Sequence, residues 1–129
     1  MTLVGETSTH GGAPARDGWT PVCVISDLEV ERGRAALLGD TQIALFLLHS
    51  GRVHAVSNRD PYSGAHVISR GIVGTREDVP TVASPMFKQV FDLRTGVCID
   101  TQGRDAAALR VWTVTVVDGN VELDAEEIR

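Results

Sequence analysis

The 129 residues of this chain are enough for one domain, and their hydrophobic fraction of 43% is ordinary for a globular protein. A formal net charge of −5 excludes a typical nucleic-acid partner, because phosphate binding needs clustered Lys and Arg. We see no signal-peptide pattern and no run of ~20 apolar residues that could span a membrane, so we expect a cytoplasmic protein with no membrane partner.

The N-terminal segment differs in composition from the rest of the chain. Residues 1–17 are rich in Gly, Thr, Ser and Ala and contain few large apolar side chains. Such a segment buries too little surface to offset the entropy lost on ordering. We therefore expect a flexible tail over residues 1–17 and a single β domain over residues 18–126.

Short strand-like runs follow one another along this domain. Turn signals such as Gly39-Asp40 and Ser50-Gly51 separate them, and one helical turn is expected near Ser26. Because the turns recur every few residues and no long helical period is present, the sequence predicts an all-β sandwich or barrel. The expected strands are residues 19–25, 34–38, 41–48, 52–56, 89–92, 97–99 and 109–117.

The last of these runs gives the strongest β signal. Trp112, Val114 and Val116 recur with the period of two that is typical of a strand. We expect one continuous strand over residues 109–117, which turns back at Asp118-Gly119.

Residue types that often carry chemistry are sparse in the domain. His49 and His54 flank a turn, but two imidazoles without a third ligand make a poor metal site, and we expect exposed strand ends. Cys23 and Cys98 are the only cysteines, and we expect buried thiols rather than a disulfide. An enzyme that uses either thiol as a nucleophile is an alternative, but both lie in strand-like runs.

Two loops carry a recognisable pattern. The first reads Ser57-Asn-Arg-Asp-Pro-Tyr-Ser-Gly-Ala65, and the second reads Ser84-Pro-Met-Phe-Lys-Gln-Val-Phe-Asp-Leu-Arg-Thr-Gly96. They resemble the cluster-binding loops of Rieske iron–sulfur domains, roughly Asn-x-Cys-Pro-His-x-Gly-Ala and Cys-Pro-x-His-x-x-x-Phe-Asp-x-x-x-Gly. The resemblance implies a Rieske-like antiparallel β-sandwich or barrel. The residues that match are Asn58, Pro61, Gly64, Ala65, Pro85, Phe91, Asp92 and Gly96.

The four metal-ligand positions of that pattern hold other residue types. Asp60 and Ser84 stand where the cysteines belong, and Tyr62 and Phe87 stand where the histidines belong. A Rieske centre needs two thiolates on one iron and two imidazoles on the other. Asp60 offers a hard oxygen, the hydroxyls of Ser84 and Tyr62 hold their protons at neutral pH, and Phe87 has no lone pair. We therefore expect vacant ligand positions, no cluster or other cofactor on this chain, and no catalytic residue.

The residues that replace the ligands can be interpreted in two ways. Phe87 and Tyr62 can fill the space that a cluster would leave, because an empty cavity costs stability. Alternatively, the two loop ends form an apolar tip with a polar rim, which suits docking on a larger protein. Asp60 can instead accept backbone N–H bonds in its own loop. The candidate partner interface comprises Arg59, Asp60, Pro61, Tyr62, Ser63, Pro85, Met86, Phe87 and Lys88.

Five short matches in the right order make the resemblance more specific. They are residues 36–40, 57–62, 68–71, 82–85 and 88–93, and together they resemble the small subunit of assimilatory NAD(P)H-dependent nitrite reductase. This resemblance implies a supporting subunit in nitrate assimilation. Its expected partner is a large subunit that carries siroheme, a 4Fe-4S cluster and FAD, uses NAD(P)H, and reduces nitrite to ammonium with six electrons.

Two other functions stay open. One is a ligand-free Rieske-like binding module of another oxidoreductase. The other is a Rieske ferredoxin-type electron carrier, against which the replaced ligand residues argue.

Overall fold

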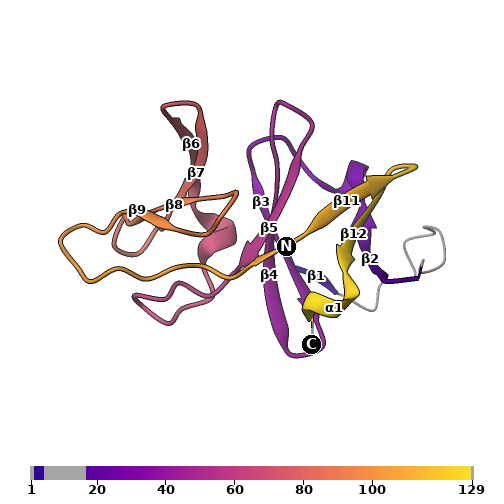
Figure 1. Ribbon diagram of the computed structural model, residues 1–129, viewed down its shortest axis with the longest axis horizontal. Helices are drawn as coiled ribbons and strands as arrows, with labels where there is room; N and C mark the ends of the chain where they lie inside the picture. Colours follow the sequence, from indigo (N-terminus) through magenta and orange to yellow (C-terminus); the bar gives the residue numbers. More distant parts are fainter. Residues whose placement is uncertain (1, 5–16, 129) are drawn as a thin grey trace.

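The computed structural model describes residues 2–4 and 17–128, and its strands form three sheets arranged side by side (Figure 1). The five-stranded sheet has the order β1-β3-β4-β5-β10, the three-stranded sheet β11-β12-β2, and the four-stranded sheet β6-β7-β8-β9. All described strand pairs are antiparallel except β1 with β3. The predicted all-β architecture of antiparallel sheets is confirmed. The strands are β1 (Thr2–Val4), β2 (Trp19–Val24), β3 (Gly33–Leu38), β4 (Thr41–Leu47), β5 (Val53–Ser57), β6 (Ile72–Arg76), β7 (Val79–Ala83), β8 (Val90–Asp92), β9 (Cys98–Asp100), β10 (Val111–Trp112), β11 (Val114–Val117) and β12 (Asn120–Asp124), and the helices are the 3₁₀ turns η2 (Ile25–Asp27) and η3 (Ile68–Arg70) and α1 (Ala125–Ile128).

Strand β4 is the centre of the molecule because it is buried on both faces. Ile43 and Leu45 pack into a core shared with the three-stranded sheet, whereas Ala44 and Phe46 pack into a second core shared with the four-stranded sheet. Successive side chains of a strand point to opposite faces, so a strand between two cores must be apolar at every position. This explains the unbroken apolar run in this part of the sequence.

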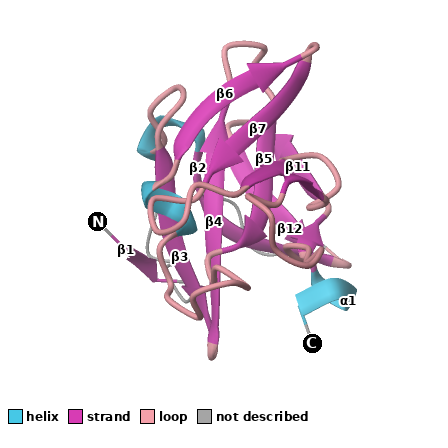
Figure 2. Ribbon diagram, turned by 90° about the vertical axis from the view of Figure 1, so that its left-hand side faces the viewer, coloured by secondary structure: helices cyan, strands magenta, loops and turns pink. Residues whose placement is uncertain are grey.

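The second core carries the four-stranded sheet that bears the loops of interest. Val82 of β7 and Phe91 of β8 pack there against Phe46. Figure 2, viewed from this end of the molecule, shows β6 and β7 in front of β4 and β5. The loops at the ends of β5 and β7 are therefore fixed by one shared hydrophobic core.

The turn after β8 explains the last glycine of the sequence pattern. Gly96 has a φ of 80°, and a Cβ there would lie 2.0 Å from the carbonyl oxygen of Leu109. Its N–H donates to the carbonyl oxygen of Asp92 at 2.7 Å. Both the left-handed backbone and the close approach require glycine.

The prediction of one strand over residues 109–117 is wrong. Val111 of β10 pairs with Val56 in the five-stranded sheet, whereas Val114 of β11 pairs with Leu123 in the three-stranded sheet. Between them, the N–H of Thr113 donates to the Glu127 carboxylate at 2.6 Å, and its hydroxyl donates at 3.0 Å. The chain changes sheets at this residue, where a side chain accepts the N–H and the carbonyl oxygen already accepts the N–H of Asp124 in β12 at 3.1 Å.

The tail expected at the N-terminus lies largely outside the described residues, since residues 1 and 5–16 are not described. Within it, Thr2–Val4 form β1, which pairs in parallel with β3, an element that the sequence analysis did not anticipate. Among the described residues, no helix has the length and apolar character needed to cross a membrane.

Candidate functional site

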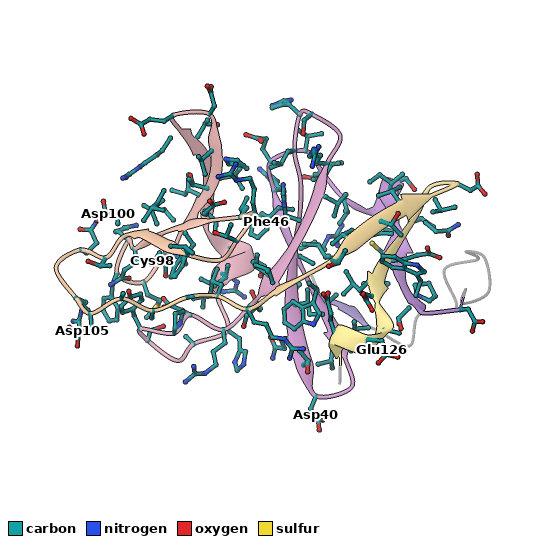
Figure 3. All side chains as sticks on the ribbon, in the orientation of Figure 1. Asp40, Phe46, Cys98, Asp100, Asp105 and Glu126 are labelled. Carbon is teal, nitrogen blue, oxygen red and sulfur yellow. The ribbon has the colours of Figure 1, made fainter. Side chains whose placement is uncertain are left out.

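Three loops meet at one end of the molecule. Loop 1 (residues 58–67) follows β5, loop 2 (residues 84–89) joins β7 to β8, and loop 3 (residues 101–108) follows β9. Figure 3 places Cys98, Asp100 and Asp105 at this end, away from Glu126. Loops 1 and 2 are the pair found by sequence, and loop 3 was not part of that pattern.

A hydrogen bond between Asp60 and Ser84 joins loops 1 and 2. The Ser84 hydroxyl donates to Oδ2 of Asp60 at 2.5 Å, and both side chains are 0% exposed. The other carboxylate oxygen accepts the N–H of Tyr62 at 2.8 Å, and the Ser84 oxygen accepts the N–H of Met86 at 3.2 Å. A buried carboxylate needs such donors, because an unpaired buried charge is very costly. The two former cysteine positions therefore form one closed polar network.

This network corrects one prediction and confirms another. Asp60 was expected in the polar rim of the tip, but it is buried and cannot present its side chain at the surface. The alternative, that its carboxylate accepts a backbone N–H of its own loop, is confirmed by the bond from Tyr62.

Backbone hydrogen bonds close each of these loops on itself. In loop 1, the N–H of Gly64 donates to the carbonyl oxygen of Asp60 at 2.7 Å. In loop 2, the N–H of Lys88 donates to the carbonyl oxygen of Ser84 at 3.1 Å. Lys88 adopts a φ of 68°, a conformation that costs a non-glycine residue roughly 1–2 kcal/mol. The packed surroundings hold both loops in tight, defined turns.

Tyr62 fills space between the loops, as one interpretation predicted. Its ring packs on the second core with its centroid 6.2 Å from that of Phe91, and its hydroxyl donates to the carbonyl oxygen of Asp105 at 2.8 Å. Burial raises the pKa of Tyr62 above its ordinary value, and the neighbouring Cys98 thiol adds to the shift. The side chain therefore stays a neutral phenol that ties loop 1 to loop 3.

Phe87 does not fill the space between the loops. Its side chain is 43% exposed, and that of Met86 is 46% exposed. The guanidinium of Arg104 lies over the Phe87 ring, 5.2 Å from the centroid. The interpretation of Phe87 as internal filler is therefore wrong, and both residues present apolar surface at the tip.

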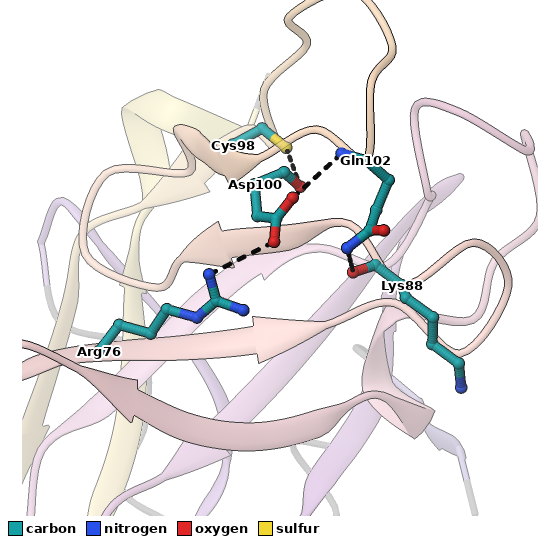
Figure 4. Close-up of polar contacts among 5 residues, drawn as sticks. All are labelled: Arg76, Lys88, Cys98, Asp100 and Gln102. Atoms are coloured by element: carbon teal, nitrogen blue, oxygen red, sulfur yellow. Dashed lines mark hydrogen bonds and ion pairs between the residues drawn. The ribbon is translucent and has the colours of Figure 1, made fainter.

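Loop 3 was missed as part of the site. The side-chain amide of Gln102 donates to the carbonyl oxygen of Lys88 at 3.4 Å, and the N–H of Gln102 donates to Asp100 at 3.1 Å (Figure 4). Asp100 is held in turn by an ion pair with Arg76 at 3.4 Å. The sequence offered only a weak signal, the polar Thr101-Gln-Gly-Arg-Asp105 turn, because its partners lie far away along the chain.

A buried amide lies at the base of loop 2. Gln89 is 0% exposed, and neither Nε2 nor Oε1 of its side chain has a hydrogen-bond partner among the described residues. Its backbone oxygen accepts the N–H of Ser84 at 2.9 Å. The amide is thus an internal polar group whose burial costs stability.

The remaining candidates do not form a reactive site. His54 is half-buried rather than exposed, and burial together with the nearby Arg52 lowers its pKa below the ordinary value. His49 and His54 line one groove of about 530 Å³, but the described residues contain no group of three or more His, Cys, Asp or Glu that could hold a metal ion.

The two thiols differ in burial: Cys23 is buried as expected, whereas the expectation of a buried thiol is wrong for Cys98. Burial raises the pKa of Cys23 to about 12, with Asp27 adding to the shift. Cys98 is half-buried, and its Sγ lies 3.4 Å from the carbonyl oxygen of Asp100. A nucleophilic cysteine needs an accessible thiolate, which Cys23 lacks.

Comparison with known families matches residues 18–124 to the Rieske-like [2Fe-2S] domain. The chain belongs to the Rieske-like [2Fe-2S] domain family. The match covers the described strands from β2 to β12 and all three loops.

Within this family the chain is similar to nitrite reductase subunits. It is 39% identical to the NADH nitrite reductase small subunit of Escherichia coli K12 over 81% of this chain and 95% of that protein. It is 36% identical to the NAD(P)H nitrite reductase large subunit of Klebsiella oxytoca over 85% of this chain and 11% of that protein. A crystal structure of an NADH-dependent nitrite reductase small subunit from Mycobacterium tuberculosis superposes with a TM-score of 0.74 at 44% identity, covering 81% of this chain and 92% of that one.

The residues of this Rieske-like domain do not fit the [2Fe-2S] group that gives the family its name. Asp60 and Ser84 hydrogen-bond each other directly at 2.5 Å, the Tyr62 phenol is neutral, and Phe87 offers only carbon. A Rieske centre requires soft thiolates and imidazoles. The scaffold is shared with the family, and the donor set is not.

Proposed function

We propose that this chain is a non-catalytic small subunit of an NAD(P)H-dependent nitrite reductase and holds no cofactor itself. It binds a large subunit that carries siroheme, a 4Fe-4S cluster and FAD, and it supports the six-electron reduction of nitrite to ammonium in nitrate assimilation. The similarity to nitrite reductase small subunits over most of both chains supports this function.

The observation that carries the proposal is the set of contacts made by the residues that stand at the ligand positions of the Rieske pattern. The Ser84–Asp60 hydrogen bond holds loops 1 and 2 together without thiolates, and Met86 and Phe87 remain exposed beyond it. A loop pair that keeps its shape without iron ligands has a use other than electron transfer. Aromatic and Met side chains are enriched in protein interfaces, so these two residues suit contact with a partner.

The interface that we propose is the tip expected from the sequence, without Asp60. Arg59, Lys88, Met86 and Phe87 are exposed there. The half-buried Pro61, Tyr62, Ser63 and Pro85 support them from within the two loops. Binding at this end would leave β11 and β12 free, since they lie at the opposite end of the molecule (Figure 1).

Co-expression with the large subunit tests the proposal. We expect the two chains to co-purify, and nitrite-dependent NADH oxidation to depend on both. The isolated small chain should contain less than about 0.1 iron per molecule, because its donor set does not suit the cluster. Stoichiometric iron and acid-labile sulfide would instead favour a ferredoxin-type electron carrier.

Two double variants, each of which removes two exposed apolar side chains, test where the interface lies. Met86→Ala with Phe87→Ala should abolish co-purification while leaving the fold intact, because both side chains are exposed. Val30→Ala with Val116→Ala is the matched control, since those side chains are 44% and 41% exposed outside the tip. Loss of the complex with the control pair, but not with the tip pair, would place the interface elsewhere.

A ligand-free module of another oxidoreductase is the second candidate. It predicts a stable complex with a different flavoprotein and no effect of this chain on nitrite-dependent NADH oxidation.

A further inference from the structure

We propose that loop 3 joins loops 1 and 2 in a single basic docking surface, and that this surface recognises an acidic, apolar-centred face of the large subunit. The inference rests on the proposed function. It adds the chemistry of the partner surface and a third loop that the sequence pattern did not include.

Direct contacts connect every pair of the three loops. The Ser84–Asp60 bond joins loops 2 and 1, and the Tyr62 hydroxyl joins loop 1 to the backbone of loop 3. Loop 3 returns to loop 2 through the Gln102 amide and through Arg104, which lies over Phe87. Because each loop is fastened to the other two, the surface they form is largely preorganised, which lowers the entropy cost of binding.

The exposed charges of this surface are mostly positive. The charged residues of the three loops are Arg59, Asp60, Lys88, Arg104 and Asp105, and Asp60 is buried. Three cations and one anion therefore face solvent, on a chain whose formal net charge is −5. A basic end on an acidic protein orients the approach of a partner, because complementary potentials steer association and disfavour wrong partners.

These three cations have no acidic partner within the described part of the chain. Some other exposed arginines do: Arg76 pairs with Asp100, and Arg94 pairs with Asp92. The ion pairs found among residues 2–4 and 17–128 do not include Arg59, Lys88 or Arg104. Their charges remain available to carboxylates of another molecule.

An apolar centre accompanies the positive charges. Met86 and Phe87 are exposed beside Arg104, and a groove of about 450 Å³ runs between Tyr62 and residues 103–107. An interface with an apolar centre and a charged rim is the usual anatomy of a specific complex. The matching partner surface presents an apolar side chain to Met86 and Phe87, with Asp or Glu around it.

Charge reversal tests the inference with the full chain and the purified large subunit. Arg59→Glu with Lys88→Glu should weaken binding at least about tenfold at low salt, because it places like charges across the interface. The matched control is Arg32→Glu with Arg52→Glu, which changes net charge equally at exposed sites outside the three loops and should change affinity less than about twofold. Binding of the wild type should weaken as salt rises, since salt screens exposed charges.

A variant that is expected to bind more tightly is a control for misfolding, because a misfolded chain would bind more weakly. Asp105→Asn removes the exposed anion of the three loops, while the backbone oxygen that accepts the Tyr62 hydroxyl stays in place. We expect about two- to threefold tighter binding. Arg104→Gln should weaken binding several-fold, because it removes the cation that lies over Phe87.

The outcomes separate this inference from the proposed function. If the wild-type chain does not bind the large subunit at any salt concentration, the proposed function fails. If it binds, but the two reversal pairs weaken binding equally or Asp105→Asn binds no more tightly, the basic docking surface is refuted and the subunit assignment stands.

Discussion

The Ser84 hydroxyl and the Asp60 carboxylate meet at 2.5 Å, although the two residues lie 24 positions apart in the chain. They occupy the positions that hold cysteines in the Rieske pattern. In that pattern one iron, held by both thiolates, connects the two loops. Here a buried hydrogen bond makes the same connection, which keeps the loops in place without metal.

Removal of this bond should destabilise the domain. Ser84→Ala leaves one carboxylate oxygen of Asp60 and the N–H of Met86 without their partner, so we expect a loss of about 2–3 kcal/mol in the free energy of unfolding. Urea unfolding followed by circular dichroism measures it. A double-mutant cycle with Asp60→Ala should give a coupling energy of about 1 kcal/mol or more. Simple additivity would show that the bond contributes little to the fold.

Gln89 offers a stabilising substitution. Its buried amide has no partner among the described residues, so Gln89→Met keeps the volume and removes the cost of burying an amide. We expect the free energy of unfolding to rise by about 1–3 kcal/mol, measured by urea unfolding. Phe91→Met, two residues along the chain in β8, serves as a control that should destabilise because it removes a packed aromatic ring. A loss of stability in Gln89→Met would mean that ordered water satisfies the amide.

Cys23 should resist alkylation in the folded state. Its pKa is raised to about 12 and its side chain is buried, so almost no accessible thiolate exists at pH 8. In a Cys98→Ala variant, we expect iodoacetamide to react at least about 100-fold more slowly than in 8 M urea, as followed by mass spectrometry. Equal rates with and without urea would contradict the buried position.

The raised pKa of Cys23 also predicts alkaline sensitivity. The unfolded thiol ionises near pH 9, whereas the folded thiol holds its proton until about pH 12. The stability from this group is therefore complete below pH 9 and is lost as pH rises from 9 to 12. Cys23→Ala should lose less stability over this range than the wild type, which thermal unfolding at each pH can show.

Asp92 should contribute to acid unfolding. Burial alone would raise the pKa of this carboxyl, but hydrogen bonds from the Arg94 side chain and backbone outweigh burial and hold the pKa below its ordinary value of 3.8. The folded state therefore gains stability above about pH 4, and this gain is lost as pH falls through the lowered pKa. Asp92→Asn should be less stable than the wild type at pH 7, and the difference should shrink toward pH 2. The free energy of unfolding of both proteins can be measured with urea at each pH. If the Asp92–Arg94 pair contributed nothing, the difference between the two proteins would be the same at every pH.

Several features of the fold could be predicted because they depend on local pattern. The expected strands at residues 19–25, 34–38, 41–48 and 52–56 agree with β2 to β5 within one residue at each end. Periodicity and turn residues fix these elements, and the turn at Asp118-Gly119, with φ values of 51° and 81°, is the form that this dipeptide favours. The break at Thr113 had no such signal, because the group that accepts its N–H there is a carboxylate 14 residues further along the chain.

The features of the candidate site also separate into those that depend on local residue pattern and those that depend on contacts between distant residues. Residue type and spacing alone were enough to predict the Rieske-like family, the two loops and the absence of thiolate and imidazole at the four ligand positions. The burial of Asp60 against Ser84, the exposure of Phe87 and the contribution of loop 3 to the tip became visible in the folded chain. These are contacts between residues far apart in the chain, and their geometry is set by the core that packs β7 and β8 against β4.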